Sequence, residues 1–330
     1  MAVTANTNET YDVTTIREDL SKAMASISPT ETIFMSTIGS RNVDNTYFEW
    51  SEVDLAATGA NRQIEGDVGL SNTAPTNAVR KGGYTQISAK VVEVSSTNQA
   101  VNGVANAQTV AKQVAYKLAE LKRDMEAMLL ANVAAAAGSS GTARQTAGLP
   151  AYLTSNVSRG SGGANGTTSG TGESGSVNAA ATDGTLRPLT ETLLKDVIKG
   201  CWDSGAQPSV VMCGSAQKQK ISAFTGNATR FKEAEDSKLN AAIDVYIGDF
   251  GELQIVPNRH MRVRTVSSVD YTPDVFVLDP NYAEVAYLQT AKQEPLAKTG
   301  LSERRLISCE YGLQVTSQKA HGVVADVNAS

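Results

Sequence analysis

The longest hydrophobic pattern in the chain has helical spacing and covers about residues 103–137. Its apolar residues lie three or four positions apart and form one stripe along a helix: Val110, Val114, Leu118, Leu121, Met125 and Met128. Neither Pro nor Gly interrupts the pattern, and Gly138 follows it as the expected C-terminal cap. At about 1.5 Å per residue, the pattern predicts a helix about 50 Å long. Such a helix suits a strut in an extended molecule, because it exceeds what a compact core needs.

Shorter elements are predicted before this helix. Residues 1 to about 14 are small and polar, which is typical of a flexible arm. The stretch TTIREDLSKAMASIS, residues 14–28, has the spacing of a short amphipathic helix. Ser28, Pro29 and Glu31 form a capping box, which predicts a second helix that begins there and ends at Gly39.

Two strands joined by a long connection come next. In TYFEWSEVDLA, residues 46–56, Phe48 and Trp50 alternate with polar residues, as a strand with one buried face requires. A partner strand is predicted in TQISAKVVEVSS, residues 85–96. The roughly 28 residues between them are many more than a hairpin needs, and they have little to bury. We expect this excursion to find its partner on another molecule.

The second half of the chain alternates short helices and strands. Residues 155–185 are mostly Gly, Ser, Thr and Asn, which predicts a flexible linker or surface loop. Then follow a helix over 189–206 capped by Thr190, a buried strand over 208–214, a helix over 215–224, strand pairs around 248–251 and 279–280, and a closing strand that turns back near Gly312. Helices and mostly antiparallel strands in separate runs indicate the α+β class.

Charge and composition exclude some functions. The net charge is −5, from 29 basic and 34 acidic residues, and no basic run is present. The balance argues against a groove that grips a polyanion, although a protein that only faces nucleic acid fits it. We expect no signal peptide, because the first residues show no basic region followed by an apolar run. We expect no membrane span, because no apolar stretch reaches about 18 residues. The three cysteines are far apart and are expected to be buried thiols in a reducing cytoplasm.

The usual signs of catalysis or metal binding do not occur in the sequence. His260 and His321 lack the spacing of a metal site and are expected at the surface or at strand ends. The sequence contains no GxSxG elbow, nucleotide-binding loop or calcium loop. Trp50 and Trp202 lie in apolar patterns and are expected in the core. We therefore expect no catalytic, cofactor-binding or metal-binding residue.

The order of these parts resembles the major capsid proteins of tailed bacteriophages with the Hong Kong 97 phage fold. Local motifs narrow the resemblance to the major head proteins of SU-type enterobacterial phages: SPTETIFMSTIG at 28–39, FEWSEVDL at 48–55, VSSTNQAV at 94–101, ELKRDMEAMLLAN at 120–132, LTETLLKDVIKGCWDSGAQPSVVMCG at 189–214 and KTGLSERRLISCEYGLQVTSQKAHGVV at 298–324. The resemblance spans about residues 15–325 without the Gly-rich segment. The chain departs from it at Gly300-Leu301, where the family more often has Gly-Asp.

The resemblance implies an α+β capsid fold with an N-terminal arm, an extended β-hairpin loop, a long spine helix in a peripheral domain, and an α/β axial domain. The implied divisions are an N-terminal arm at 1–27, a short helical segment at 28–45, the extended hairpin loop at 46–96, the peripheral domain with the spine helix at 97–154, the Gly/Ser-rich surface loop at 155–185, the axial domain at 186–290, and returning peripheral strands at 291–330.

The resemblance also implies a function without enzymatic activity. Many copies would assemble as hexamers and pentamers into an icosahedral shell around double-stranded DNA, in the host bacterial cytoplasm. DNA contact is expected to be loose, because few basic residues are offered to phosphates. Portal and scaffolding proteins are expected partners, and the need for a decoration protein is left open. Inter-subunit ion pairs are expected from Arg62, Glu65, Arg80 and Lys81 near the hairpin tip, and from Arg304 and Arg305 in the closing turn.

Three alternatives are weighed against the capsid. An encapsulin-type nanocompartment would share the fold and hold a protein cargo instead of DNA. A cytoplasmic enzyme without a recognisable motif would form a small oligomer rather than a megadalton particle. A secreted fibre or surface-layer subunit would need an export signal, which the first residues do not show.

Overall fold

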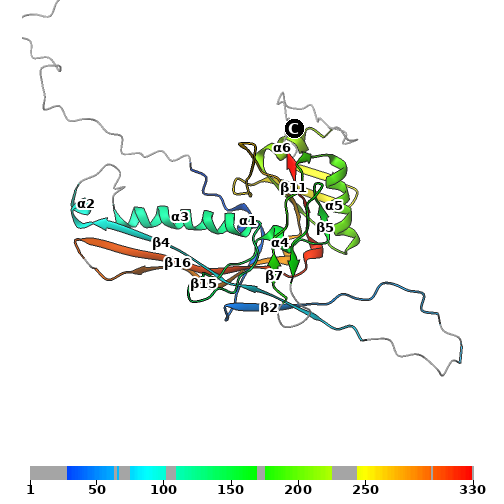
Figure 1. Ribbon diagram of the computed structural model, residues 1–330, viewed down its shortest axis with the longest axis horizontal. Helices are drawn as coiled ribbons and strands as arrows, with labels where there is room; N and C mark the ends of the chain where they lie inside the picture. Colours follow the sequence, from blue (N-terminus) through cyan, green and yellow to red (C-terminus); the bar gives the residue numbers. More distant parts are fainter. Residues whose placement is uncertain are drawn as a thin grey trace, which may run out of the picture.

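The computed structural model describes residues 28–62, 65–66, 75–101, 109–168, 175–224, 244–298 and 300–328. It has three visible parts (Figure 1). A long platform extends to one side, a rounded lobe stands above its other end, and a hairpin arm projects past the lobe. The expected arm at 1–27 and the first amphipathic helix lie outside the described residues.

The platform is one four-stranded sheet with a long helix packed on it. The sheet has the order β1 (Gly39–Asn42), β15 (Ala283–Pro295), β16 (Ser302–Val315) and β4 (Gln86–Ser95). Helix α3 (Val110–Leu129) packs on β4 and β16, with Leu121 and Met125 buried in the contact. At the edge of this contact, Lys90 Nζ pairs with Asp124 Oδ2 at 2.7 Å. The apolar stripe read from the sequence therefore faces the sheet.

Helix α3 is shorter than its sequence pattern predicts. It has 20 residues, about 30 Å, and it ends at Leu129 rather than Ala137; residues 102–108 lie outside the described chain. The chain leaves the helix because tertiary hydrogen bonds hold the following residues: Ala135 N–H donates to Val177 O at 2.9 Å. These bonds outweigh the helix preference of an alanine run. Gly138, with φ of 73°, serves a tight turn instead of the helix cap.

The capping box at Ser28 does not begin a helix. Helix α1 spans only Ile33–Thr37, and its N-cap residue Thr32 makes no side-chain capping bond. The carboxylate of Glu126 on α3 takes that role, because it accepts hydrogen bonds from the N–H groups of Phe34 and Met35. Short α1 is therefore held by tertiary contact rather than by its own sequence.

The hairpin arm is built on β2 (Tyr47–Glu52) and β3 (Val79–Tyr84), which pair antiparallel. The predicted partner at 85–96 was wrong, because β4 pairs with β16 in the platform. Thr85 separates β3 from β4, and its buried hydroxyl donates to Glu310 Oε1 at 2.7 Å. Phe48 and Trp50 are buried, as their alternation predicted.

The lobe contains a six-stranded mixed sheet with a core on each face. Its order is β10 (Val245–Gly248), β11 (Gly251–Pro257), β9 (Val210–Cys213), β14 (Val275–Leu278), β17 (Gly322–Val324) and β5 (Asn156–Ser158). Val211 and Cys213 point to the core formed with α5 (Glu191–Asp203) and α6 (Ser215–Ser222). Val210 and Met212 point to the other core, which continues into the platform. The lobe and the platform thus share one hydrophobic core.

Several predicted elements are confirmed. Thr190 caps α5, since its hydroxyl accepts from Leu193 N–H. The strand over 208–214, the helix over 215–224 and the strand pairs around 248–251 and 279–280 are all present. The smaller elements are α2 (Ser96–Ala100), α4 (Leu149–Tyr152), β6 (Thr167–Thr168), β7 (Val177–Ala179), β8 (Arg187–Pro188), β12 (Arg264–Val266), β13 (Val269–Tyr271), β18 (Val327–Asn328) and the 3-10 turns η2 (Pro280–Tyr282) and η3 (Gln318–Ala320).

The described part of the Gly/Ser-rich segment is packed, so the expectation of a flexible linker was wrong there. It supplies β5 to the lobe sheet, and Val177 is fully buried. Gly160 lies so close to the chain at Thr185 that a Cβ there would meet Thr185 O at 2.0 Å. The small residues of this segment allow backbones to approach, a use that composition alone does not reveal.

The closing strand also differs from its prediction. Strand β16 runs straight through Gly312, and the chain reverses only after Val315. Gly312 is needed for close approach, because a Cβ there would lie 2.7 Å from the Phe48 ring. Strand β17 then joins the lobe rather than the platform.

Of the aromatic and imidazole side chains singled out in the sequence, Trp202 was placed wrongly. Trp202 is 49% exposed and packs its ring on Phe250, with ring centroids 5.1 Å apart. His321 does stand at a strand end, before β17, but it is fully buried.

Candidate assembly interface

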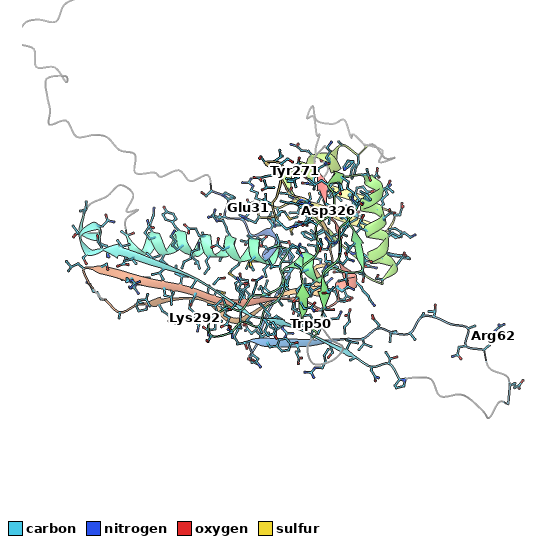
Figure 2. The ribbon with its side chains drawn as sticks, viewed as in Figure 1. Glu31, Trp50, Arg62, Tyr271, Lys292 and Asp326 are labelled. Atoms are coloured by element: carbon cyan, nitrogen blue, oxygen red, sulfur yellow. The ribbon has the colours of Figure 1, made fainter. Side chains whose placement is uncertain are left out.

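The hairpin arm is the most exposed feature of the described chain. Residues 53–62 and 75–78 are all exposed and form no regular structure. Figure 2 shows Arg62 far from the body of the molecule. Leu55 is 85% exposed and Val53 is 53% exposed. Apolar side chains on a projecting segment indicate a surface that is covered by another molecule.

The root of the arm is fixed to the body by polar contacts. Glu52 pairs with Lys81 across the hairpin and accepts a hydrogen bond from Ser317 Oγ at 2.6 Å. Asp54 pairs with Lys319 at 2.6 Å. A cleft of about 290 Å³ lies beside these contacts, lined by residues 51–54, 204–206, 282, 316–317 and 319–320. The direction in which the arm leaves the body is therefore set by the turn after β16.

The charged residues expected near the hairpin tip do not lie together. Arg62 and Glu65 are exposed in the outer arm. Arg80 and Lys81 lie instead in β3 at the root, which corrects the expected position. There Arg80 pairs with Glu49 and Lys81 pairs with Glu52, both within the same chain.

Arg304 and Arg305 lie at the opposite end of the molecule and not in a turn. Both belong to β16, at the tip of the platform (Figure 1). Arg304 Nε is 3.4 Å from Glu93 Oε2, and Arg305 Nε donates to Glu303 Oε1 at 3.0 Å. The six predicted contact residues thus lie at three separate places: Arg62 and Glu65 in the outer arm, Arg80 and Lys81 at its root, and Arg304 and Arg305 near the platform tip.

The platform tip and open sheet face carry apolar residues that sequence reasoning missed. Leu301 is 84% exposed, and its carbonyl accepts a hydrogen bond from Ser96 N–H at the start of α2. Val101, at the end of α2, is 58% exposed. On the sheet face away from α3, Ile87 is 59% exposed and Val91 is 47% exposed. An apolar residue in a polar turn was the available signal for Leu301, because the resembling proteins more often have Asp there.

A further apolar surface lies at one edge of the lobe. Strand β10 ends the sheet order, and its Val245 and Ile247 are 51% and 73% exposed. The exposed Trp202, whose ring packs on the half-buried Phe250, adds to the apolar surface of the lobe. Exposed edge strands and aromatic pairs are typical of surfaces that meet another protein.

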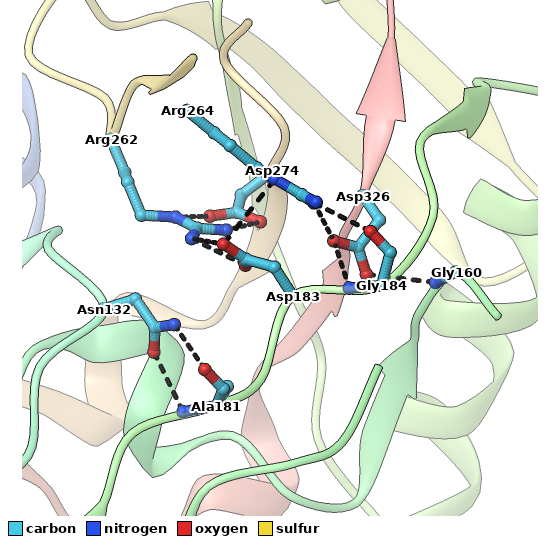
Figure 3. A network of polar contacts seen from close by, with 9 residues as sticks. All are labelled: Asn132, Gly160, Ala181, Asp183, Gly184, Arg262, Arg264, Asp274 and Asp326. Carbon is cyan, nitrogen blue, oxygen red and sulfur yellow. Dashed lines mark hydrogen bonds and ion pairs between the residues drawn. The ribbon is translucent and has the colours of Figure 1, made fainter. Parts of the chain in front are cut away.

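A largely buried network of ion pairs joins segments of the lobe behind these surfaces (Figure 3). Arg262 binds Asp274 Oδ2 at 2.8 Å and Asp183 Oδ1 at 2.7 Å. Arg264 binds Asp326 Oδ1 at 2.9 Å. Burial raises the pKa of Asp274, although the nearby Arg262 guanidinium opposes this. These charges compensate one another and leave a structural network rather than a reactive group.

The three cysteine side chains serve packing rather than catalysis. Burial raises the pKa of the Cys201 and Cys213 thiols to about 12 and that of Cys309 to about 11, so all three stay protonated and unreactive. Their burial was predicted from the sequence. In the described ranges, no group of three His, Cys, Asp or Glu residues is placed to bind a metal ion. No helix in those ranges is long and apolar enough to span a membrane.

The sequence and the fold have clear relatives. The sequence model of the SU10 major capsid protein family matches residues 3–328. The major capsid protein of Escherichia phage Phieco32 is 25% identical over 335 residues, covering 90% of each chain. A chain of the Gordonia phage Cozz structure is 12% identical, with a TM-score of 0.60 over 96% of this chain and 92% of that one. The SrpI encapsulin of Synechococcus elongatus is 11% identical, with a TM-score of 0.56 over 96% and 94%.

These comparisons agree with the geometry. At 11–12% identity the two solved structures show the fold alone, and that fold is the one implied by the order of motifs. The sequence matches are what separate the phage proteins from the encapsulin. Because the family match covers nearly the whole chain, this protein belongs to the SU10 major capsid protein family, and it is a tailed-phage major capsid protein, a structural component of the virion that forms the head shell.

Proposed function

We propose that copies of this chain join as hexamers and pentamers into an icosahedral shell that encloses double-stranded DNA. The observation that carries the proposal is the hairpin arm, whose residues 53–62 are exposed and include Leu55 at 85%. Burying a leucine side chain contributes about 1.5–3 kcal/mol, which the isolated chain forgoes. A neighbouring copy would supply that burial many times over in a closed assembly.

The arm is proposed to lie on the platform of the next subunit. Arm and platform tip are at opposite ends of the long axis (Figure 1), as a head-to-tail contact between copies requires. Ile87 and Val91 on the open sheet face offer apolar surface to Val53 and Leu55 of the arm. The contact would be modest for each copy and stable through repetition.

The ion pairs within the chain change which of the six predicted residues we propose to pair with a neighbouring copy. Arg62 and Glu65 in the outer arm remain proposed partners across the interface. Four of the six residues, Arg80, Lys81, Arg304 and Arg305, already pair with Glu49, Glu52, Glu93 and Glu303 in the same chain, and would contact a neighbour only in addition.

The parts of the chain are proposed to follow the capsid fold. The platform corresponds to the peripheral domain and the lobe to the axial domain, and the shared core joins them. The divisions are 1–27, 28–45, 46–96, 97–154, 155–185, 186–290 and 291–330. The sheets call for adjustments to these bounds: β1 and β4 belong to the platform sheet, β5 and β17 belong to the lobe sheet, and the platform strand β15 already begins at Ala283.

Contact with DNA is proposed to be loose. The chain has a net charge of −5 and no basic run, so few phosphate contacts are available. Portal and scaffolding proteins complete the proposed set of partners.

The SrpI encapsulin shares the fold over 94% of its own chain, so the fold alone does not separate an encapsulin-type shell from a phage head. The two functions differ in what the shell holds. Electron microscopy of the purified protein should show closed particles with six-fold and five-fold clusters. Particles from infected cells should contain DNA. Particles loaded with one cargo protein and free of DNA would favour the encapsulin, and a small soluble oligomer would contradict both.

A further inference from the structure

A buried carboxylate stands where the platform meets the lobe. Glu126 of α3 is fully buried. Its Oε1 accepts hydrogen bonds from Phe34 N–H at 2.6 Å and from Asn258 Nδ2 at 2.7 Å. Its Oε2 accepts from Met35 N–H at 2.9 Å. A buried carboxylate is costly unless hydrogen bonds satisfy it, and here three amide N–H groups do so.

The donors come from separate parts of the molecule. Phe34 and Met35 belong to α1, which lies between the end of α3 and the lobe (Figure 1). Asn258 follows directly after β11 of the lobe sheet. Its N–H donates to Cys213 O at 2.9 Å, and its Oδ1 accepts from His260 N–H at 2.8 Å. Glu126 therefore links the platform helix to a side chain that the lobe holds rigidly.

A second polar link lies on the same boundary. Just beyond α3, Asn132 Nδ2 donates to Ala181 O at 2.6 Å, and its Oδ1 accepts from Ala181 N–H at 3.0 Å (Figure 3). Apolar contacts in the shared core are non-directional, so they resist sliding between the two parts less well than directed hydrogen bonds do. Two polar links at separate points can oppose rotation of the lobe about the end of α3.

We propose that Glu126 is a positioning residue that sets the angle between lobe and platform, and through it the curvature with which subunits join. The inference rests on the proposed shell function. In a closed shell every copy repeats the same subunit shape, so a small change of angle in each copy adds up to a change of particle diameter. The role requires both oxygens of Glu126 to accept hydrogen bonds.

Glu126→Gln tests this directly, because it keeps the volume and replaces one acceptor oxygen with an N–H₂ donor that faces N–H groups. Asn258→Leu is the second variant; it removes the bond from the lobe and leaves the cap on α1. Glu310→Gln is the matched control. Glu310 is also a buried carboxylate, and it binds Arg144 at 2.6 Å and Thr85 at 2.7 Å, away from this boundary.

The measurements are the unfolding midpoint of the subunit and the diameter of shells in electron micrographs. The expected result for Glu126→Gln and Asn258→Leu is folded subunits whose shells have a shifted mean diameter or a spread at least about twice that of the wild type. The expected result for Glu310→Gln is a lowered midpoint with wild-type diameter.

Three results would overturn the inference. The first is that shells of both Glu126→Gln and Asn258→Leu have the wild-type diameter. The second is that shells of the Glu310→Gln control show the same altered diameters as those two variants. The third is that neither variant folds, which would mean that Glu126 serves folding rather than positioning. A wild-type chain that forms no shells would instead contradict the proposed function.

Discussion

Buried polar side chains in this protein tie together segments that are distant in the sequence. Asp326 is fully buried and accepts from Gly160 N–H at 3.0 Å, Gly184 N–H at 2.9 Å and Arg264 Nη1 at 2.9 Å. Leaving such a group without its partner costs on the order of 1–3 kcal/mol. Single residues of this kind therefore hold the C-terminal strands, the Gly-rich segment and the lobe in one arrangement.

From the buried His321 ring we predict that the folded subunit loses stability in acid. Burial lowers its pKa from 6.5 to about 4, and its Nδ1 accepts from Asp279 N–H at 3.4 Å, which requires the neutral ring. Between pH 6.5 and 4 this ring binds a proton in the unfolded chain but stays neutral in the folded chain. The free energy of unfolding should therefore fall over this range, by up to about 3 kcal/mol from this group.

Chemical denaturation at several pH values measures this contribution. His321→Gln removes the titrating ring, so its unfolding free energy should depend less on pH between 6.5 and 4 than that of the wild type. Parallel pH curves for the two proteins would show that His321 does not carry the effect.

A charge reversal at Arg62 tests whether the outer arm takes part in assembly. It is exposed far from the body, so Arg62→Glu should leave the unfolding free energy of the subunit within about 0.5 kcal/mol of wild type. The same change should slow or prevent shell formation, followed by light scattering, while Arg62→Lys should assemble normally. Normal assembly of Arg62→Glu would remove this residue from the interface.

Elements were predictable where local signals and packing agree. The strand Val210–Cys213 is a short apolar run between turn residues, and Thr190 is a strong cap, so both were found. Prediction failed where distant contacts decide the outcome. The partner of β2 depends on the separation of β3 from β4 at Thr85, and the end of α3 depends on the bond from Ala135 to Val177.

The Gly/Ser-rich segment is an element-scale case in which composition misled. Gly160 touches the backbone of Thr185, so Gly160→Ala should destabilise the subunit by about 1–3 kcal/mol through overpacking. Gly141→Ala is the control, since a Cβ there has open space. Thermal or denaturant unfolding compares the two, and equal stability would mean that the segment yields to the added methyl group.

At the scale of the whole molecule, the description is a body with a shared core and an arm that the body does not cover. The existence of the arm followed from a connection too long for a hairpin. The positions of its charged residues could not be predicted, because Arg80 and Lys81 are placed in β3 by the strand register that pairs Trp50 with Lys81. Exposed apolar residues such as Leu301 were missed, since a single exposed residue has no periodicity.

The central claim is that the arm gains its burial from neighbouring copies. The most direct measurement is sedimentation of the wild-type chain beside a variant in which residues 55–76 are replaced by Asn-Gly, which keeps β2, β3 and the Asp54–Lys319 pair. The account predicts megadalton shells from the wild type, and a folded variant of equal stability that stays a small species. Shells of the variant that match the wild type in size and yield would contradict it.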